Sequence, residues 1–308
     1  MKKIRNTVLA LSLFTLVGCG VKVEPVKDNP DTSTEGDSAE AKSSATLRFS
    51  AIPDENSTEL KAKYDKVAVY LSGKLDVPVE FVPTKDYGAA VEEFVNGNIH
   101  LAWFGGLTGV QARHLVPGAN AIAQGVEDPA YYSYFIAHKD SGLTPGEDFP
   151  KEVATVPFTF GSEKSTSGRL MPQHFIQQFT GKSLEEFFGD NRPLFSGAHD
   201  LTYEWVKTGK VKAGALSYKT YDKLAAKDDS GDVQIIWKTP AYADYNFTAH
   251  PELEKMFGEG FTAKLQQTLV DIESADILAS FQRASLIPAK NEEFDGIKKI
   301  ATALGFLE

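Results

Sequence analysis

The sequence predicts an α/β fold in two lobes, in which parallel strands alternate with helices. Apolar runs typical of strands and segments with apolar residues at helical spacing follow one another in the order strand 47–52, helix 57–71, strand 77–82, helix 89–96, strand 99–104 and helix 107–115. Strands that are joined through helices by short connections pair in parallel, with the helices on the faces of the sheet. The folded part, about residues 46–308, is long enough for two lobes.

Each element of the first lobe has a local signal. Residues 47–52 (LRFSAI) alternate in polarity, and Pro78 favours an edge position or a strand start for the second strand. Two further strands are predicted at 119–124 and 132–138. Ligands of parallel sheets bind beyond the carboxyl ends of the strands. The strand-to-helix turns are therefore candidate binding sites, at residues 53–56, 84–87, 103–106 and 161–168.

The second lobe is expected to begin after Asp140, where the loop-like segment SGLTPGEDFPKEV serves as the first crossing. Its predicted elements include strands at 158–160, 213–217 and 233–237 and helices at 170–176, 184–188, 201–208 and 222–226. The Pro-rich aromatic segment TPAYADYNF is predicted as the return crossing, and the helical pattern from Pro251 packs back on the first lobe. The expected division is thus first lobe 46–140, second lobe 141–238, and return crossing with the end of the first lobe 239–308.

A hydroxyl-rich turn, FTFGSEKSTSGRLMPQHF at residues 158–175, is the most informative stretch. A strand ends at Phe160, three consecutive hydroxyl residues follow at Ser165, Thr166 and Ser167, and a helix begins. A helix N-terminus carries partial positive charge and free N–H groups, so it favours an anion. One hydroxyl is enough to cap a helix. Three in a row exceed that need, and oxyanion binding is the favoured interpretation of the turn.

The first 19 residues have the pattern of a secretory signal. A basic start precedes an apolar run that is too short to cross a membrane, and the run ends in Leu16-Val17-Gly18-Cys19, which resembles the lipobox of bacterial lipoproteins. That resemblance implies cleavage before Cys19 and lipidation of its sulfur. Cys19 is the only cysteine, so no intramolecular disulfide forms. Residues 20–45 are polar and are predicted to be a flexible tether. We therefore expect a protein anchored at the outer face of the membrane or in the periplasm.

The formal net charge of −10 excludes general nucleic-acid binding, which needs clustered Lys and Arg. An acidic protein also cannot attract anions through bulk charge. An anion site in this chain must be local, made of oriented N–H and O–H dipoles with one or two cations.

Five segments, in order, resemble a known group of proteins. They are DYGAAVEEFVNGNIHLAWFGGLTGVQAR, the STSGR turn, SGAHD, GALSYKTYD and TPAYADYNF, spread over roughly residues 47–250. The chain resembles the substrate-binding lipoproteins of ABC importers for phosphonate, phosphite and related oxyanions, most closely the branch labelled as selenate-binding proteins. The resemblance implies a periplasmic-binding-protein fold of type II, with a ligand cleft between two lobes. It also implies a monomer that delivers a small oxyanion to a permease and its ATPase, without a cofactor.

The resemblance also assigns candidate ligand residues. Ser165, Thr166 and Ser167 match the turn that holds the oxygens of a tetrahedral anion. The other matched positions are Tyr87, Trp103, Phe104, His199, Asp200, Tyr242, Asp244 and Tyr245. Binders of aminoalkylphosphonates carry acidic residues for the ammonium group, and whether Asp200 or Asp244 has that role here stays open.

Several candidates also have ordinary structural explanations. Arg169 supplies a two-pronged contact to an oxyanion or points to solvent, and both readings stay open. Asp200 is expected to orient the His199 ring and keep it protonated. Tyr132 is expected to line the cleft with Tyr87 and Trp103. Phe104 fits core packing better than Trp103 does.

Two other functions fit some of these residues. Ser167, His199 and Asp200 include the residue types of a hydrolase triad, but no G-x-S-x-G motif surrounds the serine. A sensory lipoprotein that feeds a signalling partner is the other alternative. The six histidines are scattered without a metal-binding motif, and no phosphate-binding loop of the nucleotide-hydrolase kind is present, so any ATPase is a partner protein.

Overall fold

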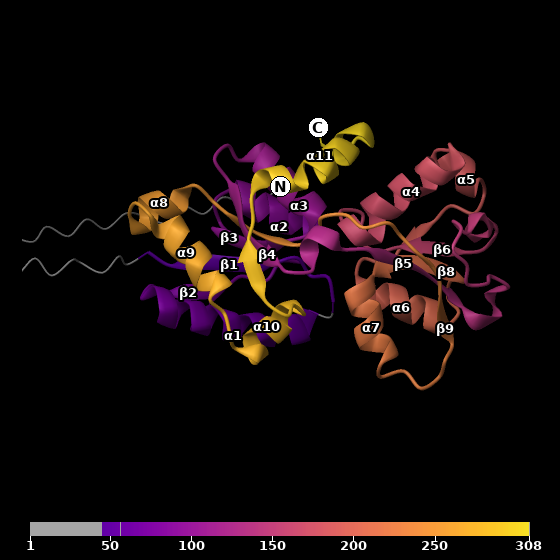
Figure 1. Ribbon diagram of the computed structural model, residues 1–308, viewed down its shortest axis with the longest axis horizontal. Coiled ribbons are helices and arrows are strands. Elements are labelled where there is room, and N and C mark those ends of the chain that lie inside the picture. Colours follow the sequence, from indigo (N-terminus) through magenta and orange to yellow (C-terminus); the bar gives the residue numbers. More distant parts are fainter. Residues whose placement is uncertain (1–44, 56, 308) are drawn as a thin grey trace, which may run out of the picture. The chain divides into compact units, whose positions relative to one another are not determined.

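The structure, a computed structural model, describes residues 45–55 and 57–307. The predicted signal peptide, Cys19 and residues 20–44 lie outside the described residues. The described residues form two sheets (Figure 1). The first sheet has six strands, in the spatial order β11 (Leu286–Pro288), β4 (Asn120–Gly125), β10 (Asn246–Ala249), β3 (Leu101–Phe104), β1 (Leu47–Ala51) and β2 (Val79–Phe81).

The second sheet has five strands and comes from the middle of the chain. Their spatial order is β7 (Leu194–Phe195), β6 (Phe158–Phe160), β8 (Ala213–Ser217), β5 (Ser133–His138) and β9 (Val233–Lys238). In Figure 1 the first lobe therefore combines the indigo and yellow ends of the colour scale, whereas the second lobe holds magenta and orange segments. The predicted two-lobed α/β fold is confirmed.

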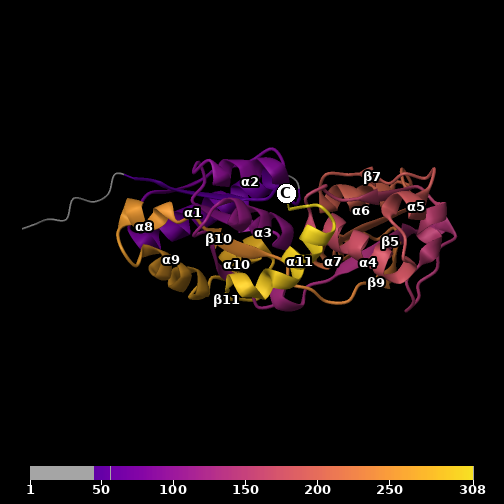
Figure 2. The same cartoon turned by 90° about the horizontal axis from the view of Figure 1, so that it is seen from above.

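Helices pack on both sheets. Those of the first lobe are α1 (Ser57–Leu75), α2 (Tyr87–Val95), α3 (Gly106–Leu115), α8 (Glu252–Phe257), α9 (Phe261–Val270), α10 (Ala275–Phe281) and α11 (Asp295–Ala303). Those of the second lobe are α4 (Met171–Thr180), α5 (Leu184–Phe188), α6 (His199–Lys207) and α7 (Tyr218–Ala225). Helix α3 contacts both α2 and α11, an arrangement that Figure 2 shows from above, while α1 contacts α9 and α10.

The predicted parallel pairing holds where strands alternate with helices. Strand β1 pairs in parallel with both β2 and β3, and β6 pairs in parallel with β7 and β8. The two strands that follow the crossings are antiparallel to their neighbours: β10 to β3 and β4, and β5 to β8 and β9. Each enters its sheet from the other lobe, so no crossover helix fixes a parallel direction.

The first crossing lies earlier than the sequence predicted. Strand β5 was assigned to the first lobe, with the crossing after Asp140, but β5 pairs with β8 and β9 of the second sheet. The chain therefore changes sheets between Gly125 and Ser133. Tyr131 on this crossing and Tyr242 on the return crossing form a β-bridge with two backbone hydrogen bonds of 2.9 Å. The prediction was wrong because an apolar run identifies a strand but does not identify the sheet that it joins.

Aromatic rings pack around the end of β3, directly before the turn that leads into α3. Trp103, at the end of β3, is 1% exposed and contacts the rings of Phe247, Phe281 and Tyr245 at centroid distances of 4.7, 5.2 and 5.5 Å. Full burial of one such ring stabilises the fold by about 1.5–3 kcal/mol. Within the described part of the chain, no helix combines the length and the apolar character that a membrane crossing requires.

Candidate functional site

The hydroxyl turn is closed on itself and buried. Ser165, Thr166 and Ser167 are 1, 2 and 1% exposed. Ser165 Oγ accepts from the Gly168 N–H at 2.9 Å, and the Gly161 N–H donates to the Gly168 carbonyl at 2.8 Å. The chain then makes a turn of π-helix, Thr166–Leu170, before α4 begins. Ser165 thus has the capping role that the alternative interpretation gave it, while the other two hydroxyls do not cap this helix.

Gly168 makes this turn possible. A Cβ at Gly168 would lie 3.0 Å from Ser165 Oγ, 3.1 Å from the His199 ring and 3.2 Å from the Gly161 Cα. Any larger residue would push the hydroxyl turn away from His199.

The two lobes meet at the N-terminus of α3. The Leu107 N–H donates to Thr166 Oγ1 of the second lobe at 2.9 Å, and the Gly106 N–H donates to Asp244 Oδ1 of the return crossing at 2.9 Å. A Cβ at Gly105 would lie 3.1 Å from Thr166 Oγ1, so the glycine permits this close approach. Asp244 and Thr166 together satisfy N–H groups that the first turn of a helix leaves free.

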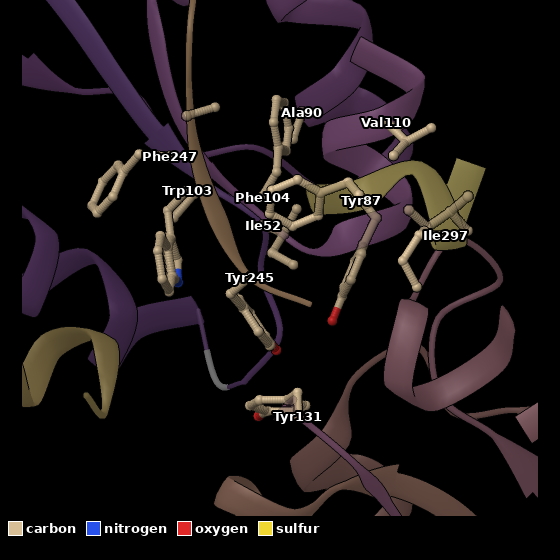
Figure 3. Packing of buried hydrophobic residues seen from close by; sticks show 14 of the residues in the cluster. Ile52, Tyr87, Ala90, Trp103, Phe104, Val110, Tyr131, Tyr245, Phe247 and Ile297 are labelled. Atoms are coloured by element: carbon tan, nitrogen blue, oxygen red, sulfur yellow. The ribbon is translucent and has the colours of Figure 1, made fainter. Parts of the chain in front are cut away.

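Four tyrosines surround the same region, and their rings are buried. Tyr245 donates to Asp54 Oδ2 at 2.8 Å, Tyr242 shares a 2.5 Å hydrogen bond with Ser133 Oγ, and Tyr131 bonds to Ser217 Oγ. Tyr87 lies beside Ser165, yet its hydroxyl has no hydrogen-bond partner among the described residues. Figure 3 shows Tyr245 and Tyr131 below Trp103, with the Tyr87 side chain to the right of Tyr245.

Ser133 links this tyrosine group to the hydroxyl turn. Its hydroxyl donates to the Ser167 carbonyl at 2.7 Å, so Tyr242, Ser133 and Ser167 form one continuous chain of hydrogen bonds. A fully paired buried network of this kind fixes the positions of its members.

His199 is neutral and faces Ser167. It is the first residue of α6, and its Nε2 lies 3.4 Å from Ser167 Oγ. Its Nδ1 lies 3.4 Å from the Ser217 N–H, which donates to it, so the ring proton belongs on Nε2. Burial lowers the pKa of His199 to about 4. The neutral ring thus offers one N–H donor toward the hydroxyl turn.

The expectation that Asp200 keeps His199 protonated is wrong. The Asp200 carboxylate accepts from the Leu201 N–H at 2.8 Å, on the first turn of its own helix. Neighbouring residues of a helix point in different directions, so adjacency in sequence does not bring these two side chains together.

Arg169 and Tyr132 also lie elsewhere. The Arg169 guanidinium stacks over Phe160, Phe195 and Phe306 at 4.8, 5.4 and 5.5 Å and donates to Gln173. It thereby joins the second lobe to the C-terminal segment instead of reaching the hydroxyl turn. Tyr132 stacks on Tyr218 at 4.0 Å and lies under Lys238 Nζ at 3.8 Å.

Tyr131, which the sequence did not single out, is buried near the site, whereas Tyr132 is partly exposed. Consecutive side chains of an extended segment point to opposite sides, so only one of the two adjacent tyrosines can face the buried side. The sequence does not tell which of the two it is. Phe104 packs against Phe94 in the core, with ring centroids 5.6 Å apart.

One buried acid near the site, Asp54, was also missed. Asp54 is 8% exposed and lies in the first of the four strand-to-helix turns that the sequence indicated. Burial, with a smaller contribution from neighbouring Glu55, raises the pKa of Asp54 to about 7. Burial likewise raises the pKa of Asp244 to about 7. The sequence predicted this turn as a candidate binding site, but nothing in the local sequence indicates that the Asp54 side chain is buried.

Asp128 and Arg283 form a buried ion pair behind the tyrosines. Arg283 Nη2 lies 2.7 Å from Asp128 Oδ1, and Nε lies 2.9 Å from Oδ2. The guanidinium also lies 4.8 Å from the ring centre of Tyr245 and 5.2 Å from that of Tyr131, one on each crossing. This pair therefore supports both crossings from the first lobe.

Helix α7 holds the second lobe to the first. Glu55 pairs with Lys223 and accepts hydrogen bonds from Thr220 at 3.3 Å and Gln282 at 2.9 Å. Lys219 pairs with Glu127 of the first crossing at 2.9 Å. Both lysines of α7 that face the first lobe are thus matched by carboxylates. A cavity lined in part by Asp54, Tyr131 and Tyr245 measures only about 10 Å³, because the side chains around it fill the space with their own contacts. Larger hollows border this region: one of about 430 Å³ is lined by Lys164 and Phe306, and one of about 370 Å³ by Tyr242 and Ile297. A third, of about 510 Å³, lies beside Phe149.

The arrangement does not resemble a catalytic triad. In a triad the histidine Nδ1–H donates to a carboxylate. Here Nδ1 of His199 accepts from a backbone N–H, and Ser167 is held by its carbonyl. Over residues 45–55 and 57–307, no cluster of three His, Asp or Glu could hold a metal ion. The site offers neutral donors: hydroxyls, one imidazole N–H and the start of a helix.

Comparisons with known proteins show the family to which the chain belongs. Residues 49–294 match the model of the family described as "ABC transporter, phosphonate, periplasmic substrate-binding protein". A probable ABC transporter phosphite binding protein from Prochlorococcus marinus (strain MIT 9301) is 36% identical over 267 residues, which cover 84% of this chain and 89% of that protein. A phosphate-import protein from Mycolicibacterium smegmatis is 29% identical over 279 residues, 84% of this chain and 86% of that protein.

Two solved structures have the same fold. The structure of the Prochlorococcus marinus protein PhnD1 in complex with methylphosphonate has a TM-score of 0.79 at 36% identity, covering 84% of this chain and 98% of that chain. A binding protein component of a Pseudomonas aeruginosa ABC phosphonate transporter has a TM-score of 0.72 at 20% identity, covering 83% of this chain and 85% of that chain, a likeness of fold alone.

Proposed function

Because the chain belongs to the phosphonate family of periplasmic substrate-binding proteins of ABC transporters, we propose that it captures a small tetrahedral oxyanion between its lobes. The candidates are phosphonate, phosphite, phosphate and selenate. The observation that carries the proposal is the meeting of three buried hydroxyls and a neutral histidine of the second lobe with the N-terminus of α3 in the first.

Neutral donors bind an oxyanion well when water is excluded. Ser167, Thr166 and the His199 Nε2–H would replace the water around the anion, and the first N–H groups of α3 would add their dipoles. Lobe opening would admit the ligand and closure would bury it, as in other two-lobed binding proteins. A permease and its ATPase would then receive the ligand. Cys19, if lipidated, would anchor the chain, which we expect to act as a monomer without catalytic activity.

Isothermal titration tests this proposal. The chain from residue 19 onward, made with Cys19→Ser so that it carries no lipid, is titrated with methylphosphonate, phosphite, phosphate, sulfate and selenate. We expect saturable binding of at least one of these anions at one site per chain. If none of them binds, the proposed function is wrong. Turnover of a chromogenic phosphoester that Ser167→Ala abolishes would favour the hydrolase instead, and the absence of neighbouring permease and ATPase genes would favour a sensory role.

The α7 contacts predict an effect on ligand release. Lys223→Met removes one of the ion pairs that hold the lobes together, so we expect the dissociation rate and the Kd of the best-bound anion to rise about 3- to 10-fold. Stopped-flow kinetics measures both rates. Lys207→Met is the matched control, because Lys207 and Asp228 form a partly buried pair within the second lobe. Equal dissociation rates in the two variants would contradict the idea that the ion pairs of α7 hold the two lobes together.

A further inference from the structure

We propose that each oxyanion bound at this site shares one proton with Asp244, in a hydrogen bond between the carboxyl group and an oxygen of the anion. The inference rests on the proposed function and concerns how its site is charged. Asp244 lies on the return crossing, directly before β10, and is 1% exposed. One of its two oxygens, Oδ1, accepts from the Gly106 N–H.

The other oxygen of Asp244 is free to contact a ligand. Asp244 Oδ2 is buried and has no hydrogen-bond partner among the described residues. Thr166 of the hydroxyl turn lies beside the Asp244 carboxyl group: a Cβ at Gly105 would lie 3.1 Å from Thr166 Oγ1 and 3.3 Å from Asp244 Oδ1. The Tyr87 hydroxyl is the second buried polar group of the site without a partner. An anion held by the turn would therefore lie against a carboxyl group.

The cations next to the two crossings are already paired with carboxylates, while Lys164, directly before Ser165, is exposed. The Asp244 N–H donates to the Asp128 carbonyl, and Asp128 takes up the charge of Arg283 through two hydrogen bonds. Lys219 and Lys223 are paired with glutamates, and His199 is neutral. The facing tyrosine hydroxyls contribute no charge: their partners are Ser217 for Tyr131, Ser133 for Tyr242 and Asp54 for Tyr245.

Charge balance then requires a proton. Two adjacent anions in a buried site repel strongly unless one of them is protonated, as in paired carboxylates that share a proton. The proton can lie on Oδ2 and be donated to the anion, or lie on an anion oxygen and be donated to Oδ2. Burial raises the pKa of Asp244 to about 7, so the carboxyl group holds a proton at little cost near neutral pH. Phosphonate, phosphite and phosphate can bring the proton themselves, whereas sulfate and selenate must obtain it through Asp244.

Proton counting tests the inference. The Cys19→Ser chain is titrated with methylphosphonate at about pH 8.5, where both groups have lost their protons, in buffers of different ionisation enthalpy. We expect the uptake of about one proton for each anion bound, and a Kd that rises about tenfold per pH unit from about pH 8 upward. Asp244→Asn keeps the acceptor for the Gly106 N–H. In this variant, the number of protons taken up on binding should fall, and the Kd should rise less steeply with pH. Asp222→Asn, on the partly exposed side of α7, is the matched control and should behave as the parent chain.

The outcomes separate the two claims. Binding by the parent chain without proton uptake overturns the shared proton but leaves the proposed function standing, and it would also be the result if Oδ2 served an ammonium group of the natural ligand. Uptake that persists unchanged in Asp244→Asn overturns the assignment to Asp244. If Asp244→Asn binds no methylphosphonate, the proton count of the parent chain decides. Failure of the parent chain to bind any of the five oxyanions overturns the proposed function, and the shared proton with it.

Discussion

Replacing Arg283 with methionine is expected to lower the free energy of unfolding by about 3–5 kcal/mol. The side chains of Arg283 and Asp128 are 3 and 0% exposed, so the substitution would leave a buried carboxylate without its counter-ion. Methionine keeps most of the apolar contact with Trp103, Tyr131 and Tyr245, and the loss would therefore report the charge and its hydrogen bonds. Urea unfolding, followed by tryptophan fluorescence, measures the change.

Lys66→Met is the matched control for Arg283→Met. Lys66 and Asp276 form an ion pair whose side chains are 59 and 69% exposed, so its removal should cost less than about 1 kcal/mol. The double variant Arg283→Met with Asp128→Asn should regain part of the loss, because the uncompensated charge is gone. Equal stabilities of Arg283→Met and Lys66→Met would show that the buried pair does not support the crossings.

Combining Ser165→Ala with Thr166→Val is expected to weaken oxyanion binding by at least about 100-fold. Ser165 Oγ holds the Gly168 N–H, and Thr166 Oγ1 holds the Leu107 N–H across the lobes. Both substitutions also remove a hydroxyl donor from the anion, and an anion oxygen left unpaired in a buried site costs about 1–3 kcal/mol of binding free energy for each donor, while valine keeps the shape of threonine. Titration of the double variant with the anion that the parent chain binds best measures the loss.

Ser162→Ala provides the control within the same loop. The Ser162 hydroxyl accepts from the Lys164 N–H at 3.4 Å, and alanine keeps the Ser162 carbonyl that accepts from the Ser165 N–H, so this variant should bind as the parent chain does. Circular dichroism and urea unfolding of the double variant separate lost binding from lost folding. A folded double variant that keeps tight binding would mean that the anion does not contact this turn.

Local neutral donors explain how a chain with an acidic composition can bind an anion. A chain with a formal net charge of −10 cannot draw an anion in through bulk charge, and the site contains hydroxyls, a neutral imidazole and the start of a helix. Such a site distinguishes anions by the number and placement of their oxygens, since a missing oxygen leaves a buried donor unpaired.

Local pattern was sufficient for much of the fold. The order of strands and helices predicted the parallel trio of β2, β1 and β3, because period-2 and helical spacing report burial within a few residues. The hydroxyl turn was recognisable for the same reason: three adjacent hydroxyls before a helix are a local signal. The resemblance added Tyr242, Asp244 and Tyr245, whose burial the structure shows but whose contact with a ligand stays a prediction.

The sequence by itself determined the elements, the acidic balance and the composition of the turn between β6 and α4. Only the tertiary structure decided that β5 joins the second sheet, that Tyr131 and not Tyr132 is buried near the turn, and that Arg169 stacks on Phe306. It also decided that Arg283 pairs with Asp128, 155 residues away along the chain. The physical reason is that burial, charge pairing and the direction of a side chain depend on neighbours that are distant in sequence, and local periodicity carries no information about them.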